Sequence, residues 1–128
     1  MKLLLDTHAL IWFFLGDEKL SAPARHHIED IENAVFVSAA SAWEIATKFR
    51  IGKLAGVADL VGNYQTFLDE QQMLELPVTS KHALTGGLLE ADHEDPFDRL
   101  IAAQAILEGV PVVTADEAFD SLPLVRIS

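Results

Sequence analysis

The sequence predicts an α/β fold in which helices cover both faces of a mostly parallel sheet, giving a three-layer α/β/α sandwich. Short apolar segments with β-branched residues alternate along the chain with longer segments of helical character, which is the pattern of parallel-sheet proteins. The size of the chain is a second observation, since 128 residues, 50% of them hydrophobic, suit one domain with one core. We therefore expect a single domain over residues 1–128.

Turn and cap residues divide the chain into the predicted elements. Gly16 and Gly52 are expected to end two helices, and Pro23 lies in the first turn of another. The pair Gly86–Gly87 weakens a further helix, whereas residues 100–107 are apolar almost all round and predict a buried helix. Strands are expected at 2–5, 35–38, 74–78, 110–114 and 124–127, and helices at 7–15, from 21 onward, and at 41–51, 59–71, 80–89 and 95–107.

Charge and composition limit the possible functions. The formal net charge is −11, with 20 acidic against 9 basic residues, whereas proteins held to nucleic acid by phosphate contacts carry a basic surface. A chain that acts on RNA therefore needs bound cations, a local basic stripe or a partner. The absence of cysteine excludes thiolate metal sites and fits a reducing cytoplasm. Residues 9–15 form the longest apolar run, and Asp6 and His8 interrupt the first leucines, so we expect a cytoplasmic protein with neither membrane span nor signal peptide.

Four acidic residues fall just after predicted strands or in the first turn of the helices that follow. They are Asp6, Glu44, Asp98 and Asp116. Ligands of open parallel sheets bind outside the carboxyl ends of the strands, so all four acids are expected at one edge of the sheet. Asp6 is the most informative, because a carboxylate that ends a run of leucines is partly buried and needs a partner or a metal.

The other three acids also have ordinary structural explanations. Ser41 and Glu44 have the spacing of a capping box. Asp95 is typical of an N-cap before Pro96, and an acid at Asp98 is favoured by the helix dipole. Asp116 fits an ordinary turn and helix start. Taken singly, each of these short patterns is weak evidence for a catalytic site.

Together the four acids predict a metal site. Two carboxylates about 4 Å apart repel each other by roughly 4 kcal/mol at an effective dielectric constant near 20, so a fold gathers them only around positive charge. Oxygen ligands without cysteine or a histidine pair suit Mg²⁺ or Mn²⁺, and such ions activate water against phosphodiesters. Asp6 and Asp98 are expected to be direct ligands, with Glu44 binding a second ion or orienting water and Asp116 acting through a bound water.

Several neighbouring residues are candidates for supporting roles. Thr7 and Thr114 carry hydroxyls beside the predicted site, although capping and turn formation explain them as well. Lys48 belongs to a basic stretch with Arg50 and Lys53. These residues are expected to contact RNA phosphates or the acidic residues of a partner, although positive charge at the end of a helix also simply complements the helix dipole. Arg99 is expected to bind phosphate or to pair with a local acid. The five histidines show no metal-ligand spacing.

Four motifs in order resemble the PIN-domain nucleases, and most of all the VapC-type toxins of prokaryotic toxin–antitoxin pairs. The motifs are LLLDTH at residues 3–8, SAASAWEI at 38–45, DPFDRLIAAQA at 95–105 and VTAD at 113–116. The resemblance implies an α/β/α sandwich, Mg²⁺- or Mn²⁺-dependent endoribonuclease activity, a homodimer and inhibition by a small antitoxin. It places the family's acids on Asp6, Glu44, Asp98 and Asp116; Asp98 is preferred to Asp95 because it directly precedes the apolar helix.

Two other classes of function remain open from the sequence. A phosphatase or nucleotide-binding module would use similar acids on an α/β sheet, but no glycine-rich phosphate loop or P-loop lysine motif is present. A non-catalytic interaction protein that kept the fold is the other alternative, and the presence of all four acids argues against it.

Overall fold

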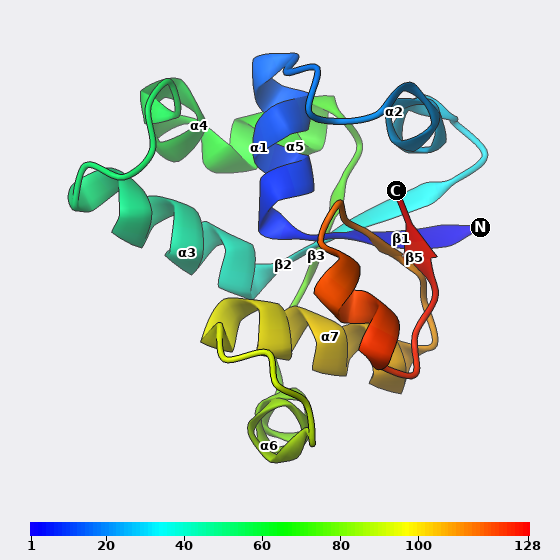
Figure 1. Ribbon diagram of the computed structural model, residues 1–128. Helices are drawn as coiled ribbons and strands as arrows, with labels where there is room; N and C mark the ends of the chain where they lie inside the picture. Colours follow the sequence, from blue (N-terminus) through cyan, green and yellow to red (C-terminus); the bar gives the residue numbers. More distant parts are fainter.

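The computed structural model describes residues 1–128 and contains one five-stranded, all-parallel sheet (Figure 1). The strand order is β3-β2-β1-β4-β5, so β1 lies in the centre. The strands are β1 (Lys2–Leu5), β2 (Ala34–Ser38), β3 (Leu74–Leu76), β4 (Val112–Val113) and β5 (Arg126–Ile127). All strands point the same way, and their carboxyl ends therefore lie at one edge of the sheet.

Helices cover both faces of the sheet, which confirms the predicted α/β/α sandwich. In the view of Figure 1, α1, α2, α4 and α5 lie above the sheet and α6 and α7 below it. The helices are α1 (Thr7–Leu15), α2 (Ala22–Glu29), α3 (Ala39–Arg50), α4 (Ala58–Gly62), α5 (Tyr64–Glu70), α6 (Ser80–Leu88) and α7 (Pro96–Glu108), followed by a 3₁₀ helix at Glu117–Ser121. None of them has the length and apolar character needed to cross a membrane.

The central strand β1 contributes to two separate cores. Leu3 and Leu5 pack with Leu10 and other residues of the upper helices, whereas Leu4 packs with Ile101 of α7 and with Phe119. Side chains of a strand alternate between its faces, so this fully apolar strand requires helices on both sides. The buried body of α7 was predicted from its apolar sequence, and its residues 101–105 are indeed buried.

Two predicted elements differ from the structure for local reasons. The helix expected at 59–71 is divided into α4 and α5 at Asn63, whose backbone (φ −130°, ψ 34°) is not helical and whose side-chain amide donates to the Asp59 carbonyl. The later strands are shorter than predicted. Pro77 follows the end of β3, and Pro111 precedes β4; proline has no N–H to donate to a sheet.

The contact between α6 and α7 depends on Gly86. A Cβ atom at this position would lie 3.1 Å from the Arg99 carbonyl oxygen, whereas a Cβ on Gly87 would meet nothing within 4 Å. We expect Gly86→Ala to lower the free energy of unfolding by about 1–2 kcal/mol, because backbone atoms must move apart. Gly87→Ala should be neutral or stabilise by up to about 0.5 kcal/mol through helix propensity. Urea unfolding of both variants measures this, and equal stability would contradict the close packing.

Candidate active site

Asp6 lies at the junction of β1 and α1, directly after the buried leucines. Its side chain is the N-cap of α1, with Oδ1 accepting from the Ala9 N–H at 2.7 Å, and the residue is only 4% exposed. Burial raises the pKa of the Asp6 carboxyl, against the hydrogen bonds of Thr114 and Ala9 and the charge of His8. The nearby Glu44 carboxylate raises the pKa of Asp6 further.

The capping box predicted for Ser41 and Glu44 is wrong, because α3 begins earlier than expected. The N-cap is Ser38 at the end of β2, and its Oγ accepts from the Ala40 N–H at 3.0 Å. Ser41 therefore lies inside the helix, where its hydroxyl forms a 3.0 Å hydrogen bond with the buried hydroxyl of Thr7. This bond ties α3 to the start of α1. Because Ser38 is the N-cap, Glu44 lies beyond the first turn and has no capping role.

The Glu44 carboxylate is buried, and only one of its two oxygens has a partner. Its residue is 1% exposed, and Oε2 forms an ion pair with the Lys48 ammonium one helical turn later. The other oxygen, Oε1, is buried without a hydrogen-bond partner. Partial burial lowers the pKa of Lys48, but the hydrogen bond and charge of Glu44, with the charges of Asp95 and Asp98, raise it overall.

Asp98 occupies the first turn of α7, where its neighbour Asp95 is the N-cap. Oδ1 of Asp95 accepts from the N–H groups of Phe97 (2.9 Å) and Asp98 (3.3 Å), so Asp95 has the capping role that the sequence indicated. Burial raises the pKa of Asp98 to about 7, and the charges of Asp95, Asp6 and Glu44 add to the effect while His93 opposes it. The structure thus brings Asp6, Glu44 and Asp98 within electrostatic reach of one another.

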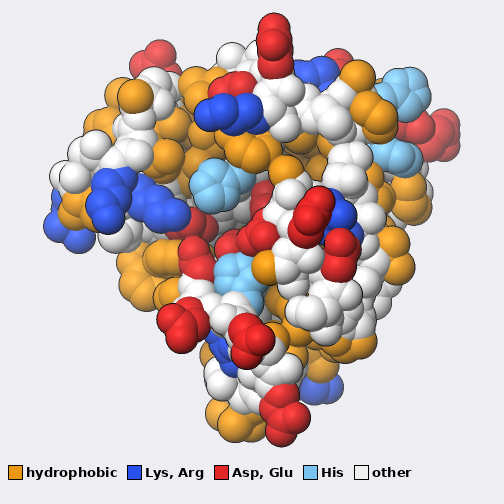
Figure 2. Space-filling model, viewed as in Figure 1, with side chains coloured by type: hydrophobic (Ala, Val, Ile, Leu, Met, Phe, Trp, Pro, Cys, Tyr) orange, Lys and Arg blue, Asp and Glu red, His pale blue; other side chains and the backbone are white.

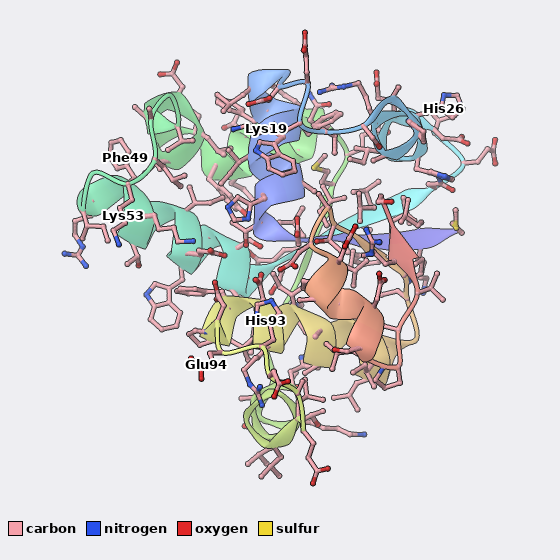
Figure 3. All side chains as sticks on the ribbon, viewed as in Figure 1. Lys19, His26, Phe49, Lys53, His93 and Glu94 are labelled. Carbon is pink, nitrogen blue, oxygen red and sulfur yellow. The ribbon has the colours of Figure 1, made fainter.

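Asp116 joins this cluster through His93, a residue that the sequence analysis missed. Nε2 of His93 lies 3.2 Å from Oδ2 of Asp98 and 3.1 Å from Oδ2 of Asp116. Figure 3 shows His93 in the loop between α6 and α7, turned toward the edge where the strands end. The spacing to its partners has no recognisable pattern, because Asp98 lies across a loop and Asp116 beyond another strand. His82, in contrast, is structural, with Nδ1 accepting from the Thr79 N–H at the cap of α6.

Thr114 connects two of the acids at the end of β4. Its Oγ1 accepts from the Asp116 N–H at 3.0 Å, and its hydroxyl also bonds to the Asp6 carboxylate. Asp116 additionally caps the 3₁₀ helix by accepting from the Ala118 N–H, so the predicted turn role and a place in the cluster coexist. The two acids are therefore oriented by one threonine.

Arg99 does not pair with a local acid, which was one of the two contacts predicted for it. The side chain instead donates to main-chain carbonyls, those of Gly86 (3.0 Å) in the last turn of α6 and of Ala91 (3.2 Å) and His93 (2.7 Å) in the loop that follows. A planar group with five N–H donors suits such convergent carbonyls. Arg99 therefore holds the loop that carries His93 against the start of α7.

The cluster is open to solvent beside a basic region. Asp6 and Asp116 line a surface depression together with His8 and Trp12. Figure 2 shows acidic side chains with two histidines in the central hollow of this face, and Lys and Arg side chains to its left. Figure 3 places Lys53 there, at the end of α3. A phosphate-bearing ligand could thus meet basic side chains next to the acids.

The donor atoms of this cluster fit a divalent cation. Acidic oxygens dominate the set, one buried oxygen of Glu44 has no partner, and Lys48 is the only ammonium paired with the acids. Carboxylates that raise one another's pKa lose their mutual repulsion when a cation binds among them. Hard oxygen ligands with one imidazole suit Mg²⁺ or Mn²⁺. The fold and the site together define an α/β protein whose acids converge at the carboxyl edge of a parallel sheet.

The chain belongs to the PIN domain family, whose model matches residues 3–124. PIN domains are nucleases, so the general class of this protein is a hydrolase. Among curated proteins no significant sequence match was found.

Solved structures with the same fold include three complexes with DNA. VapBC2 from Rickettsia felis, bound to a DNA fragment from its promoter, has a TM-score of 0.68 at 18% identity, over 99% of this chain and 98% of that one. DNA-bound VapBC from Salmonella typhimurium has a TM-score of 0.69 at 20% identity, over 100% and 97%. FitAB bound to the IR36 DNA fragment has a TM-score of 0.69 at 20% identity, over 98% and 93%. At sequence identities of 18–20%, these similarities show a shared fold and nothing more.

Proposed function

We propose that residues 1–128 form one PIN nuclease domain that cleaves RNA internally with the help of Mg²⁺ or Mn²⁺. The observation that carries this proposal is the convergence of Asp6, Glu44 and Asp98, including a buried Glu44 oxygen that has no protein partner. Asp116 reaches the same cluster through His93. A buried, unsatisfied carboxylate oxygen is costly, and a cation among the acids removes this cost.

Each acid has a distinct part in the proposed site. Asp6 and Asp98 are the direct ligands of the cation, because Asp6 is buried, the Asp98 side chain is only 14% exposed, and both carboxyls have a raised pKa. Glu44 presents its unpaired oxygen to the same region or to an attacking water, and the exposed Asp116 acts at the rim. When bound, a divalent cation supplies Lewis acidity and a water of lowered pKa for attack on phosphorus.

An RNA substrate is compatible with the acidic chain for a local reason. Lys48, Arg50 and Lys53 lie on or just after the last turns of α3, the helix that carries Glu44, and supply positive charge that the whole protein lacks. Lys48 is already paired with Glu44, so Arg50 and Lys53 are the free candidates for phosphate contacts. The bound cation completes the neutralisation of the scissile phosphate.

We further propose that the chain is the VapC-type toxin of a toxin–antitoxin pair, acting as a cytoplasmic homodimer. One solved structure with this fold is a toxin–antitoxin complex from Klebsiella pneumoniae, and another, VapBC-5 from Mycobacterium tuberculosis, is a member of the VapBC family of toxin–antitoxin systems. An exposed apolar surface over α3 and the start of α7 supports a protein partner: Trp43 is 64% exposed and lies against Phe97, with ring centroids 5.0 Å apart. Exposed aromatic residues of this kind mark interaction sites.

Cleavage of a single-stranded RNA by the purified protein tests the proposed activity. We expect internal cleavage with Mg²⁺ or Mn²⁺, none with EDTA, and a loss of at least about 100-fold in both Asp6→Asn and Asp98→Asn, because each removes charge that stabilises the transition state through the cation. The matched control is Asp59→Asn, which removes one exposed carboxylate on α4, outside the cluster.

Three results would contradict the proposal. They are cleavage that survives both substitutions, cleavage that resists EDTA, and hydrolysis of nucleotides or of the 2′-deoxy version of the substrate but not of RNA.

Light scattering of the free protein tests the homodimer. Co-purification with the product of an adjacent small gene tests the antitoxin.

A further inference from the structure

We propose that the imidazole of His93 is a ligand of the divalent cation, and that this nitrogen donor makes the site select Mn²⁺ over Mg²⁺. The inference rests on the proposed function of the acidic cluster and adds a residue to it. His93 lies outside the four acids and belongs to the loop between α6 and α7.

The first argument is the spacing of the donor atoms. Nε2 of His93 is 3.2 Å from Asp98 Oδ2 and 3.1 Å from Asp116 Oδ2, and the ligand atoms of the three residues all lie within 4.8 Å of one another. Neighbouring ligands of an octahedral ion with bonds of about 2.1 Å are about 3 Å apart. A single Nε2 carries at most one proton and cannot donate it well to two carboxylates. A cation satisfies all three groups.

The second argument is that the protein holds His93 in place from both sides. Arg99 donates to the His93 carbonyl at 2.7 Å and to the Ala91 carbonyl at 3.2 Å, which fixes the backbone of the loop. The imidazole itself packs edge-on against Phe119, with ring centroids 5.7 Å apart and planes at 74°. Phe119 is fully buried in the lower core. Rotamers locked by packing and by supporting hydrogen bonds are a property of preorganised metal sites.

A second observation, at the neighbouring Glu44, also supports a bound cation. Glu44 is 1% exposed, and its Oε1 has no partner in the protein. The Glu44 carboxylate lies close enough to Asp98 to interact with it electrostatically. A buried oxygen without a partner, on a carboxylate that interacts with Asp98, indicates a ligand, because the protein alone leaves this oxygen unsatisfied.

The identity of the donors determines which ion the site prefers. Mg²⁺ favours an all-oxygen octahedron and retains its waters, whereas Mn²⁺, a transition-metal ion, accepts an imidazole nitrogen more readily. Replacing one oxygen by the His93 nitrogen therefore weakens the site for Mg²⁺ relative to Mn²⁺. A purely acidic site would lack this preference.

Electron paramagnetic resonance of the Mn²⁺-loaded full-length protein tests the ligand directly. We expect pulsed spectra to show coupling to a directly bound nitrogen, and this coupling should change when histidine is labelled with ¹⁵N. It should disappear in His93→Gln, which keeps a polar side chain. His8→Gln is the matched control, because His8 is the other histidine near the acids. His93→Gln should also weaken Mn²⁺ binding by about 10-fold or more, and Mg²⁺ binding, measured by competition, by less.

The outcomes separate this inference from the proposed nuclease function. Mn²⁺ binding without nitrogen coupling, or with coupling that persists in His93→Gln, would refute the ligand role while leaving metal-dependent cleavage intact. Nitrogen coupling that His93→Gln removes, in a protein that does not cleave RNA, would support the ligand and refute the nuclease. A protein that binds no Mn²⁺ would refute both. Circular dichroism of His93→Gln checks that the variant is folded.

Discussion

Asp98→Asn is expected to stabilise the metal-free protein at pH 8 although it removes RNA cleavage. Burial and the charges of Asp95, Asp6 and Glu44 raise the pKa of Asp98 to about 7 from 3.8. Between these values the folded state holds a proton that the unfolded chain has released, so the contribution of Asp98 to stability is fully present below about pH 4 and is lost as the pH rises through about 7. At 1.36 kcal/mol per pH unit the loss reaches at most about 4 kcal/mol. Asparagine does not ionise and therefore avoids this loss of stability.

Thermal unfolding in EDTA measures this effect. At pH 8 we expect Asp98→Asn to unfold with a free energy larger by about 1–4 kcal/mol, which corresponds to several degrees in Tm for a chain of this size. At pH 4 the two proteins should differ little. Asp92→Asn removes the same charge from an exposed position of the neighbouring loop and should change stability little at either pH. A metal-free Asp98→Asn protein less stable than wild type at pH 8 would contradict the raised pKa.

Addition of Mn²⁺ should reverse the order of the two proteins. A ligand stabilises the folded state by RT ln(1 + [L]/Kd), which is about 2.7 kcal/mol at a concentration 100 times Kd. Wild type gains this free energy, whereas Asp98→Asn has lost a ligand and gains less. The same carboxylate thus destabilises the metal-free protein and stabilises the loaded one, which is typical of a functional site rather than of a structural one.

Lys48→Met is expected to destabilise the protein more than any other substitution of a lysine. Its ammonium is the only cation paired with Glu44, whose side chain is 2% exposed. Loss of one partner of a fully buried ion pair costs about 3–5 kcal/mol, and an exposed pair contributes at most about 1 kcal/mol. Because the Lys48 side chain is 28% exposed, we expect an intermediate loss of about 2–3 kcal/mol.

Urea unfolding with a double-mutant cycle isolates this ion pair. Glu44→Gln combined with Lys48→Met should recover most of the lost stability, because no buried charge is then left without a partner. Lys53→Met is the control, since Lys53 is exposed just beyond α3 and should cost less than about 0.5 kcal/mol. Additive effects of the two substitutions would show that Lys48 stabilises the protein independently of Glu44.

The sequence determined the fold class and the edge of the sheet where the acids meet. The reason is that alternation of apolar strands with helices, and acids placed just after strands, are local patterns that a parallel sheet converts into one three-dimensional edge. The cap at Asp95 was predicted for the same reason, because its side chain bonds to N–H groups within three residues of itself. The PIN family motifs lie in these same local segments.

Local patterns failed where two explanations competed for the same residues. Ser38 and Ser41 both precede turns of α3, and only the end of β2 decides that Ser38 is the cap. Ser41 then bonds to Thr7, a residue 34 positions away that no helix rule includes. The break at Asn63 was also invisible, because the apolar spacing continues across it.

The tertiary structure alone decided the composition of the site. One oxygen of Glu44 pairs with the Lys48 ammonium and the other has no partner, because α3 packs beside α1 and α7 and buries the carboxylate. Sequence spacing does not encode that burial. His93 approaches Asp98 and Asp116 because Arg99 holds the intervening loop through its carbonyl oxygens. Backbone carbonyls belong to every residue and leave no mark in a sequence, so contacts made through them emerge only when the chain is folded.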